Sequence, residues 1–148
     1  MKKAMYYAKE WLSLFWFSVK DFFAAIYDEM RLELAIKLAD AKQRAYNKRY
    51  FVMPDFRNKL TVLNKDDISW LKKANLMNKN VSHLEIMRDC FYYTNLSRNE
   101  EGNKLTAKER LERKDKWLSY MEGVRTKRNQ AKLKQIKKKR NGKASKGK

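Results

Sequence analysis

The sequence predicts a mainly α-helical protein with one small β-hairpin, and three features of the chain support this prediction. No proline or glycine occurs from Met1 to Met53, which leaves one long helix uninterrupted. Two short runs rich in β-branched and aromatic residues then flank the single proline, as in a hairpin. Two capping boxes, in which a serine or threonine precedes a glutamate by three residues, mark the starts of later helices.

The N-terminal helix, predicted over residues 1–48, is rich in aromatic residues. Nine of the nineteen aromatic residues of the chain lie between Tyr6 and Tyr27. Apolar residues at steps of three or four form a single stripe, which predicts an ordinary packing face. The stripe consists of Ala8, Leu12, Phe15, Val19, Phe22, Ile26, Met30, Leu34, Leu38, Ala41 and Ala45. The opposite face carries charged residues, among them Asp28 and Arg31.

The turns from Trp11 to Val19 are apolar all round, which is typical of a helix that protein or lipid encloses. Much of this 148-residue chain is too charged to enclose it. The stretch is therefore a candidate docking surface for a protein neighbour, although a core helix of the same domain gives the same pattern. The candidate docking residues are Trp11, Phe15, Trp16, Phe17, Phe22 and Phe23.

A membrane role for this helix is the alternative. A span needs about 20 apolar residues, and Lys20 with Asp21 would lie near the middle of the bilayer. The run is also too short and lacks the cleavage site of a signal peptide. A helix lying in a membrane interface usually has an excess of basic residues, whereas residues 9–33 hold five acids against three bases. We therefore rank an interfacial helix with a lipid-bound basic tail second.

Residues 49–94 predict a small ββαα unit. The runs 49–53 and 59–63 form the hairpin, with a five-residue loop from Pro54 to Asn58. Asn64 suits the N-cap of a short helix over residues 66–73. We expect the hairpin to pack on that helix through Ile68 and Leu71, with Trp70 as a further candidate.

A capping box from Ser82 to Glu85 opens the next helix, which runs through Phe91. Residues 92–94 either end that helix or form a short strand. Residues 95–105 are predicted to be a linker. A second box at Thr106 begins a basic helix over residues 106–136, and residues 137–148 are predicted to be a disordered basic tail unless bound.

The charge distribution identifies the candidate nucleic-acid site. The net charge is +19, and residues 124–148 contribute twelve basic residues and no acidic ones. Such a block usually binds an anionic partner, although a solvated tail gives the same composition. Lysine predominates and no aromatic residue follows Tyr120, which favours non-specific phosphate contacts over base readout. The candidate residues are Arg125, Lys127, Arg128, Lys132, Lys134, Lys137, Lys138, Lys139, Arg140, Lys143, Lys146 and Lys148.

No catalytic, metal or cofactor site is predicted. The single histidine, His83, and the single cysteine, Cys90, share a helix face about 10 Å apart, too far for a dyad. No second cysteine or histidine completes a zinc set. Asp55 suits a turn, and Asp66 with Asp67 suits the first turn of a helix. We therefore expect a protein that is not an enzyme.

Four stretches of the chain resemble small uncharacterised basic proteins of crAss-like tailed bacteriophages. They are Ala25 to Glu29, Lys48 to Val52, Lys59 to Asp67 and Cys90 to Thr94, and the likeness covers roughly residues 20–94. The resemblance implies a phage protein, such as a minor virion component whose basic arm meets packaged DNA. It rests on no catalytic motif and defines no functional residue.

These observations together predict a structural component of an assembly that contains nucleic acid. The N-terminal helix would dock into a protein neighbour, while the basic arm would contact the DNA or RNA backbone. We expect oligomerisation, and a location in the cytoplasm or within a virion.

Overall fold

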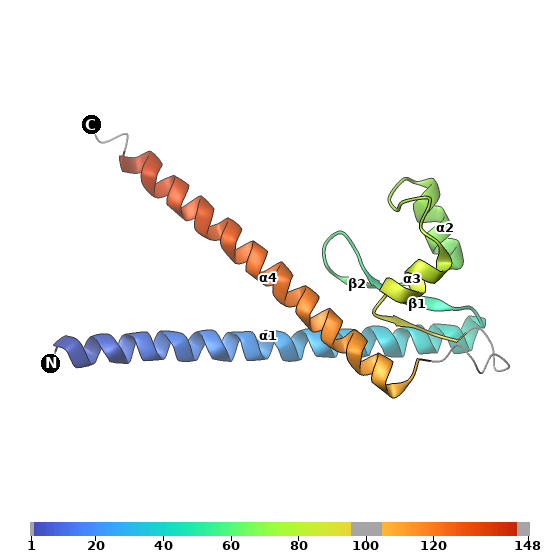
Figure 1. Cartoon of the computed structure of the whole chain (residues 1–148), viewed down its shortest axis with the longest axis horizontal. Helices are drawn as coiled ribbons and strands as arrows, with labels where there is room; N and C mark the ends of the chain where they lie inside the picture. Colours follow the sequence, from blue (N-terminus) through green and yellow to red (C-terminus); the bar gives the residue numbers. More distant parts are fainter. Residues whose placement is uncertain (1, 96–104, 145–148) are drawn as a thin grey trace.

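The computed structural model describes the backbone of residues 2–95 and 105–144, with the side chains of residues 16, 19–95 and 105–138. Its elements are α1 (Lys2–Tyr46), β1 (Tyr50–Pro54), β2 (Leu60–Asn64), α2 (Lys65–Lys73), α3 (His83–Asp89), β3 (Tyr92–Tyr93) and α4 (Ala107–Ala144). Figure 1 shows two long helices that cross, with the strands and short helices gathered beside the crossing. The predicted fold class, mainly helical with a small β element, is confirmed.

The first helix, α1, is long and uninterrupted, as predicted, and it ends at Tyr46. The next residue, Asn47, takes the left-handed conformation with a φ of 50°. Asparagine tolerates this conformation better than most residues, and its N–H donates to the Gln43 carbonyl at 2.8 Å. The helix therefore stops two residues before the predicted boundary.

The sheet has a third strand beside the predicted hairpin, in the order β2-β1-β3 with antiparallel pairing throughout. The central residue Val52 pairs with Val62 on one side and with Tyr92 on the other. Residues 92–93 thus form a strand, which decides between the two alternatives that the sequence left open. Because β1 is the central strand and has helices on both faces, Tyr50, Phe51 and Val52 are all buried.

The hairpin loop spans residues 55–59, one residue later than predicted, because Pro54 still pairs with Leu60. The Asp55 carboxylate accepts the backbone N–H groups of Arg57 and Lys59, both at 2.8 Å. Asn58 has a φ of 58°, another left-handed position that asparagine tolerates. Asp55 is therefore the turn residue that the sequence predicted.

The caps predicted for the two short helices are both present. Asn64 accepts N–H groups from the first turn of α2, and the Asp67 carboxylate accepts the Asn64 N–H at 2.9 Å. Ser82 and Glu85 form the reciprocal pair at the start of α3. Ile68 is buried as expected, whereas Trp70 is 62% exposed and adds no core contact.

Side chains on the two faces of the sheet belong to two apolar clusters. One face packs on α1 and α4, and this cluster includes Leu32, Ala39, Val52 and Trp117. The other face packs on α2 and α3 through a second, smaller cluster of Phe51, Ile68, Ile86 and Cys90. The sheet therefore forms a middle layer, which buries the near-continuous apolar run of β1.

The packing face of α1 differs from the predicted stripe. The stripe residues Phe22, Ile26, Met30, Leu34 and Leu38 are exposed. The buried face lies almost opposite and consists of Asp28, Leu32, Ala35 and Ala39. Its small alanines allow the sheet to approach closely, and the charge of Asp28 is balanced by arginines. The prediction of an ordinary packing stripe is therefore wrong over residues 22–38.

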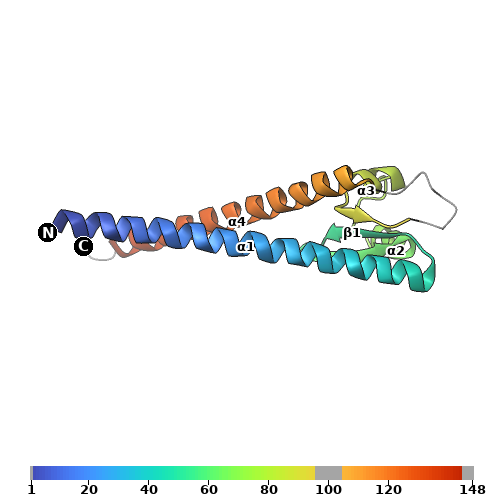
Figure 2. The same cartoon turned by 90° about the horizontal axis from the view of Figure 1, so that it is seen from below.

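The last helix, α4, begins at the predicted capping box, where Thr106 and Glu109 exchange hydrogen bonds. It continues to Ala144 instead of ending at 136, since lysine and arginine are good helix formers and no proline intervenes. Of the predicted linker, residues 96–104 lie outside the described residues, and Leu105 is buried in the core. Figure 2 shows α4 running back along the general direction of α1.

Candidate nucleic-acid and partner interfaces

Beyond Met121, α4 leaves the body of the protein and projects away from it, as Figure 1 shows. Met121 is the last buried residue of the helix, and every described side chain from residue 126 to residue 138 is exposed. A Cβ atom added at Gly123 would meet nothing within 4 Å. The described side chains of α4 from residue 126 to residue 138 are therefore open to solvent.

Six of the predicted phosphate contacts lie on this projecting helix and are exposed: Lys127, Arg128, Lys132, Lys134, Lys137 and Lys138. We call these six residues the cationic arm. Successive residues of an α-helix are rotated by about 100°, so the charges of the arm spread over roughly 220° around the axis. Leu133 and Ile136 lie in the remaining sector. The side chains of Lys139, Arg140 and Lys143 lie outside the described residues, as do Lys146 and Lys148 altogether.

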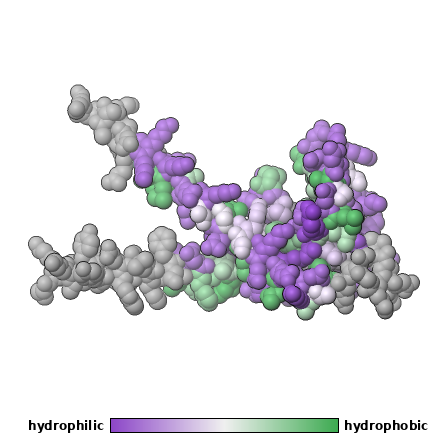
Figure 3. Space-filling model, viewed as in Figure 1, coloured by the Kyte–Doolittle hydropathy of each residue, from purple (hydrophilic) through white to green (hydrophobic). Residues whose placement is uncertain are grey.

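No ion pair neutralises the cationic arm within the described part of the chain. The last acidic residue before it is Glu122, and none follows. Figure 3 shows a mostly hydrophilic surface over this half of α4. An exposed helix with this uncompensated charge repels itself and attracts polyanions.

Arg125, the first residue of the predicted phosphate-binding set, has a different role. Its guanidinium forms an ion pair with the carboxylate of Asp28, which is only 3% exposed. Arg31 lies 3.6 Å from the same carboxylate, and the indole N–H of Trp117 donates to the Asp28 carbonyl at 2.9 Å. Arg125 therefore anchors α4 on α1. A second pair, Lys114 with Glu29, joins the same helices.

Sequence reasoning missed this anchor because Asp28 and Arg125 are 97 residues apart. In the sequence pattern Asp28 lies on the charged face of the helix, opposite the apolar stripe. The one available signal of burial was the position of Asp28 among apolar residues of a long helix. An acid on the surface of such a helix has the same neighbours in sequence, so the signal does not distinguish the two cases.

The candidate docking residues with described side chains are exposed. Trp16 is 59% exposed, Phe22 is 64% exposed and Phe23 is 63% exposed. The side chains of Trp11, Phe15 and Phe17 lie outside the described residues. In Figure 3 hydrophobic residues gather on α1 next to the grey N-terminal segment. Exposed apolar surface of this kind marks an interaction site on many proteins.

We predict that replacing both exposed phenylalanines, Phe22→Ser with Phe23→Ser, changes the free energy of unfolding by less than about 0.5 kcal/mol per site, apart from helix propensity. Neither side chain contributes to either apolar cluster. Chemical denaturation of the double variant and of the parent protein measures the difference. A loss of several kcal/mol would show that this part of α1 belongs to the core.

Three candidates for catalysis or metal binding, Cys90, His83 and Asp66, have structural roles. Cys90 is buried, and burial raises the pKa of its thiol, which disfavours a nucleophilic thiolate. His83 packs edge-on against Phe51, and burial lowers its pKa. Among the residues that the structure describes, no three histidines, cysteines or acids are grouped as a metal ion requires. Asp66 forms an ion pair with Lys48 at 2.7 Å.

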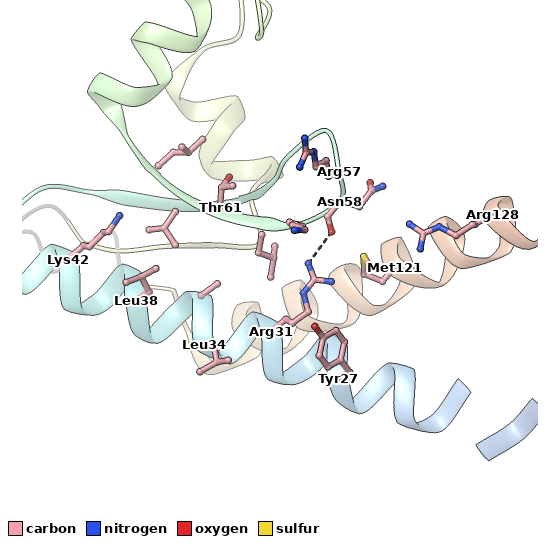
Figure 4. Close-up of a pocket in the computed structure, with 15 residues that line it drawn as sticks. Tyr27, Arg31, Leu34, Leu38, Lys42, Arg57, Asn58, Thr61, Met121 and Arg128 are labelled. Carbon is pink, nitrogen blue, oxygen red and sulfur yellow. Dashed lines mark hydrogen bonds between the residues drawn. The ribbon is translucent and has the colours of Figure 1, made fainter. Parts of the chain in front are cut away.

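A groove lies between α1, the hairpin and α4, as Figure 4 shows. Its volume is about 900 Å³, and it follows β2 from Leu60 to Leu63. At one end Asn58 closes it, because its carbonyl accepts from Arg31 at 3.2 Å and its side-chain oxygen accepts from Tyr120 at 2.5 Å. No pattern in the sequence indicated this groove.

Within the described residues, no helix combines the length and apolarity that crossing a bilayer requires. Comparison with protein-family models, with curated proteins and with solved structures finds no match to this chain.

Proposed function

We propose that this protein is a non-enzymatic structural component of an assembly that contains nucleic acid, and that its cationic arm binds the phosphate backbone without sequence preference. The observation that carries the proposal is the projection of six unpaired cations on a helix that leaves the body. A helix held in this way presents its charge to a partner and has no role in the core.

Counterion release supports a nucleic-acid partner over a small anion. Each phosphate that a lysine or arginine neutralises releases condensed ions, so affinity grows with the number of contacts. The arm offers charges around more than half of its circumference and no described aromatic side chain for stacking on bases. Binding that depends on phosphate alone suits a component that meets DNA or RNA of any sequence.

The exposed aromatic part of α1 supports a second contact, with a protein neighbour. Trp16, Phe22 and Phe23 present apolar rings on the helix that extends away from the body in Figure 1. Acidic residues such as Asp21 lie beside them, which is unlike the basic polar face usual for a helix that binds membranes. The resemblance to proteins of crAss-like phages supports a virion as the assembly.

The test is a salt titration of binding to a random-sequence duplex by fluorescence anisotropy. In the arm variant, glutamine replaces all six residues of the cationic arm. Arg125 is retained, because removing it would also release α4 from α1. We expect the slope of log K against log salt to fall in magnitude by up to about five units relative to the parent protein.

The matched control replaces lysines on the far side of the sheet, Lys65, Lys73 and Lys79, with glutamine. These residues are also exposed but lie on or after α2, away from the arm. We expect little change in the slope for this control. Equal slopes for the arm variant and the parent would refute the proposal. Anionic liposomes serve as competitor, and tight liposome binding by the arm variant would favour the interfacial helix instead.

A further inference from the structure

The strand β2 lies at an edge of the sheet, since the strand order is β2-β1-β3. An edge strand has backbone N–H and C=O groups that point away from its neighbour and are open to another chain. Natural proteins usually cover or disrupt such an edge. Here the groove of about 900 Å³ runs along β2 from Leu60 to Leu63 and leaves it accessible.

The hydrogen bonds of β1 show which residues of β2 face outward. Val52 and Tyr50 accept from Phe91 and Thr94 at 3.0 Å, so the even-numbered residues of β1 face β3. The odd-numbered residues of β1 consequently face β2, in agreement with the bond from Asp55 N–H to the Lys59 carbonyl at 2.7 Å.

Because Met53 pairs with Thr61, the odd-numbered residues of β2 form the hydrogen bonds to β1. The backbone N–H and C=O groups of Leu60 and Val62 consequently point away from β1, toward the groove. Within the described residues, no hydrogen bond occupies these outward N–H and C=O groups. They form a short row of donors and acceptors that one more extended strand would satisfy.

The floor and the rim of the groove differ in chemistry. Apolar side chains from α1 and α4, among them Leu34, Leu38 and Met121, line the floor and suit apolar side chains of an occupant. The rim carries five cations, of which Arg31 is paired with Asp28 and the other four are Lys42, Arg57, Lys59 and Arg128, while none of the fifteen described lining residues is acidic. Figure 4 shows Arg31 and Lys42 on α1, Arg57 in the hairpin loop and Arg128 on α4, so the rim draws cations from three parts of the fold.

This charge selects the occupant. A second copy paired edge to edge through β2 would bring its own set of five cations to the groove, and neither copy has an acidic lining residue to balance the other. Like charges in an interface disfavour such pairing. An extended segment with acidic residues meets the cations with opposite charge, and alternate apolar residues of such a strand reach the floor.

We propose that the groove binds an extended acidic segment of a partner protein, which adds to the sheet beside β2. Backbone hydrogen bonds to Leu60 and Val62 would hold the segment, and the cationic rim would select its charge. This site shares Arg128 with the cationic arm and does not use the aromatic end of α1. It would fix a protein neighbour on the body of the molecule independently of phosphate binding.

The probe is a fluorescein-labelled peptide of alternating valine and glutamate, about eight residues long, which is an ordinary strand length. Its binding to the full chain is followed by fluorescence anisotropy at low salt. We expect the variant Arg57→Glu with Lys59→Glu to weaken binding by roughly tenfold. The matched control, Lys73→Glu with Lys79→Glu on the other side of the sheet, should leave the affinity within about twofold.

A second variant tests the backbone contacts. Val62→Pro removes an outward N–H that β1 does not use, and proline is tolerated at strand edges. We expect binding to weaken by about fivefold. A peptide methylated at alternate backbone nitrogens gives the same test without changing the protein, so misfolding of the proline variant would not decide the result.

Three results would overturn the proposal. One is equal binding of the peptide by the parent and the charge-reversal variant. Another is equal binding of the methylated and unmethylated peptides. The third is displacement of the peptide by single-stranded DNA that is equally effective when the cationic arm is neutralised. The groove itself would then be a nucleic-acid site. Loss of duplex binding in an arm variant that keeps Arg128, with peptide binding retained, would separate this site from the phosphate-binding function.

Discussion

Replacing Trp117 with alanine is expected to lower the free energy of unfolding by about 4 kcal/mol. The side chain is fully buried where α1, α4 and the sheet meet. Its ring packs edge-on against Phe91 at 5.0 Å and stacks with Tyr120 at 5.8 Å. Alanine would leave a cavity. The side chains around it belong to three different elements, which cannot all shift to fill it.

Urea denaturation followed by far-ultraviolet circular dichroism measures this loss. The matched control is Trp70→Ala on α2, because that side chain is 62% exposed and its loss should change the stability by less than about 0.5 kcal/mol. The variant Trp117→Phe keeps an aromatic ring but loses the hydrogen bond to the Asp28 carbonyl, and about 1–2 kcal/mol is expected. Similar stabilities for Trp117→Ala and Trp70→Ala would contradict the assigned core.

The variant Arg125→Ala is expected to destabilise the protein by about 2–3 kcal/mol. It leaves the buried carboxylate of Asp28 with Arg31 as its remaining ion-pair partner. The desolvation of a carboxylate is offset only while opposite charge lies nearby. Thermal and urea unfolding of the variant measure the effect.

Arg128→Ala is the matched control, since it removes an arginine one turn later that forms no described ion pair. It should change the stability by less than about 0.5 kcal/mol. In an Asp28→Asn background, Arg125→Ala should lose much of its effect, because no buried charge remains to be balanced. A coupling energy near zero in this double-mutant cycle would show that the two side chains do not interact.

This anchor also sets the design of any binding experiment on the arm. Removal of all residues after Gly123 would delete the cationic arm and Arg125 together. A loss of duplex binding would then mix the loss of phosphate contacts with release of α4 from α1. Neutralising only the exposed cations separates the two effects.

Several elements of the fold could be predicted because their causes are local. Asn64, Ser82 and Thr106 each cap a helix through a residue at most three positions away. The loop conformation at Asp55 likewise depends on bonds within four residues. Such interactions join residues that are close together in the chain, so their pattern can be recognised in the sequence.

The packing of α1 could not be predicted in this way. The helix has an apolar stripe through Phe22, Met30 and Leu38, but the face that packs contains Leu32 and Ala39 together with Asp28. Periodicity identifies a stripe, and it does not say which of two faces meets the rest of the chain. The answer depends on Arg125 and Trp117, which reach Asp28 from α4.

The candidate sites divide along the same line. Composition alone located the basic segment, because a run of like charges repels itself and stays out of the core in any fold. Lys132 and Lys138 are exposed, in agreement with this reasoning. The groove beside β2 depends on Leu38, Val62 and Met121, which come from three separate elements. No local pattern marks such a site.

The sequence by itself determined the helices, their caps, the hairpin and the charge of the C-terminal segment, because short-range hydrogen bonds and electrostatic repulsion need no distant partner. Only the tertiary structure decided which face of α1 is buried, that residues 92–93 complete the sheet, and that Arg125 pairs with Asp28. Each of these choices is a competition between contacts far apart in the chain, and the energy of such contacts exists only once the elements have packed.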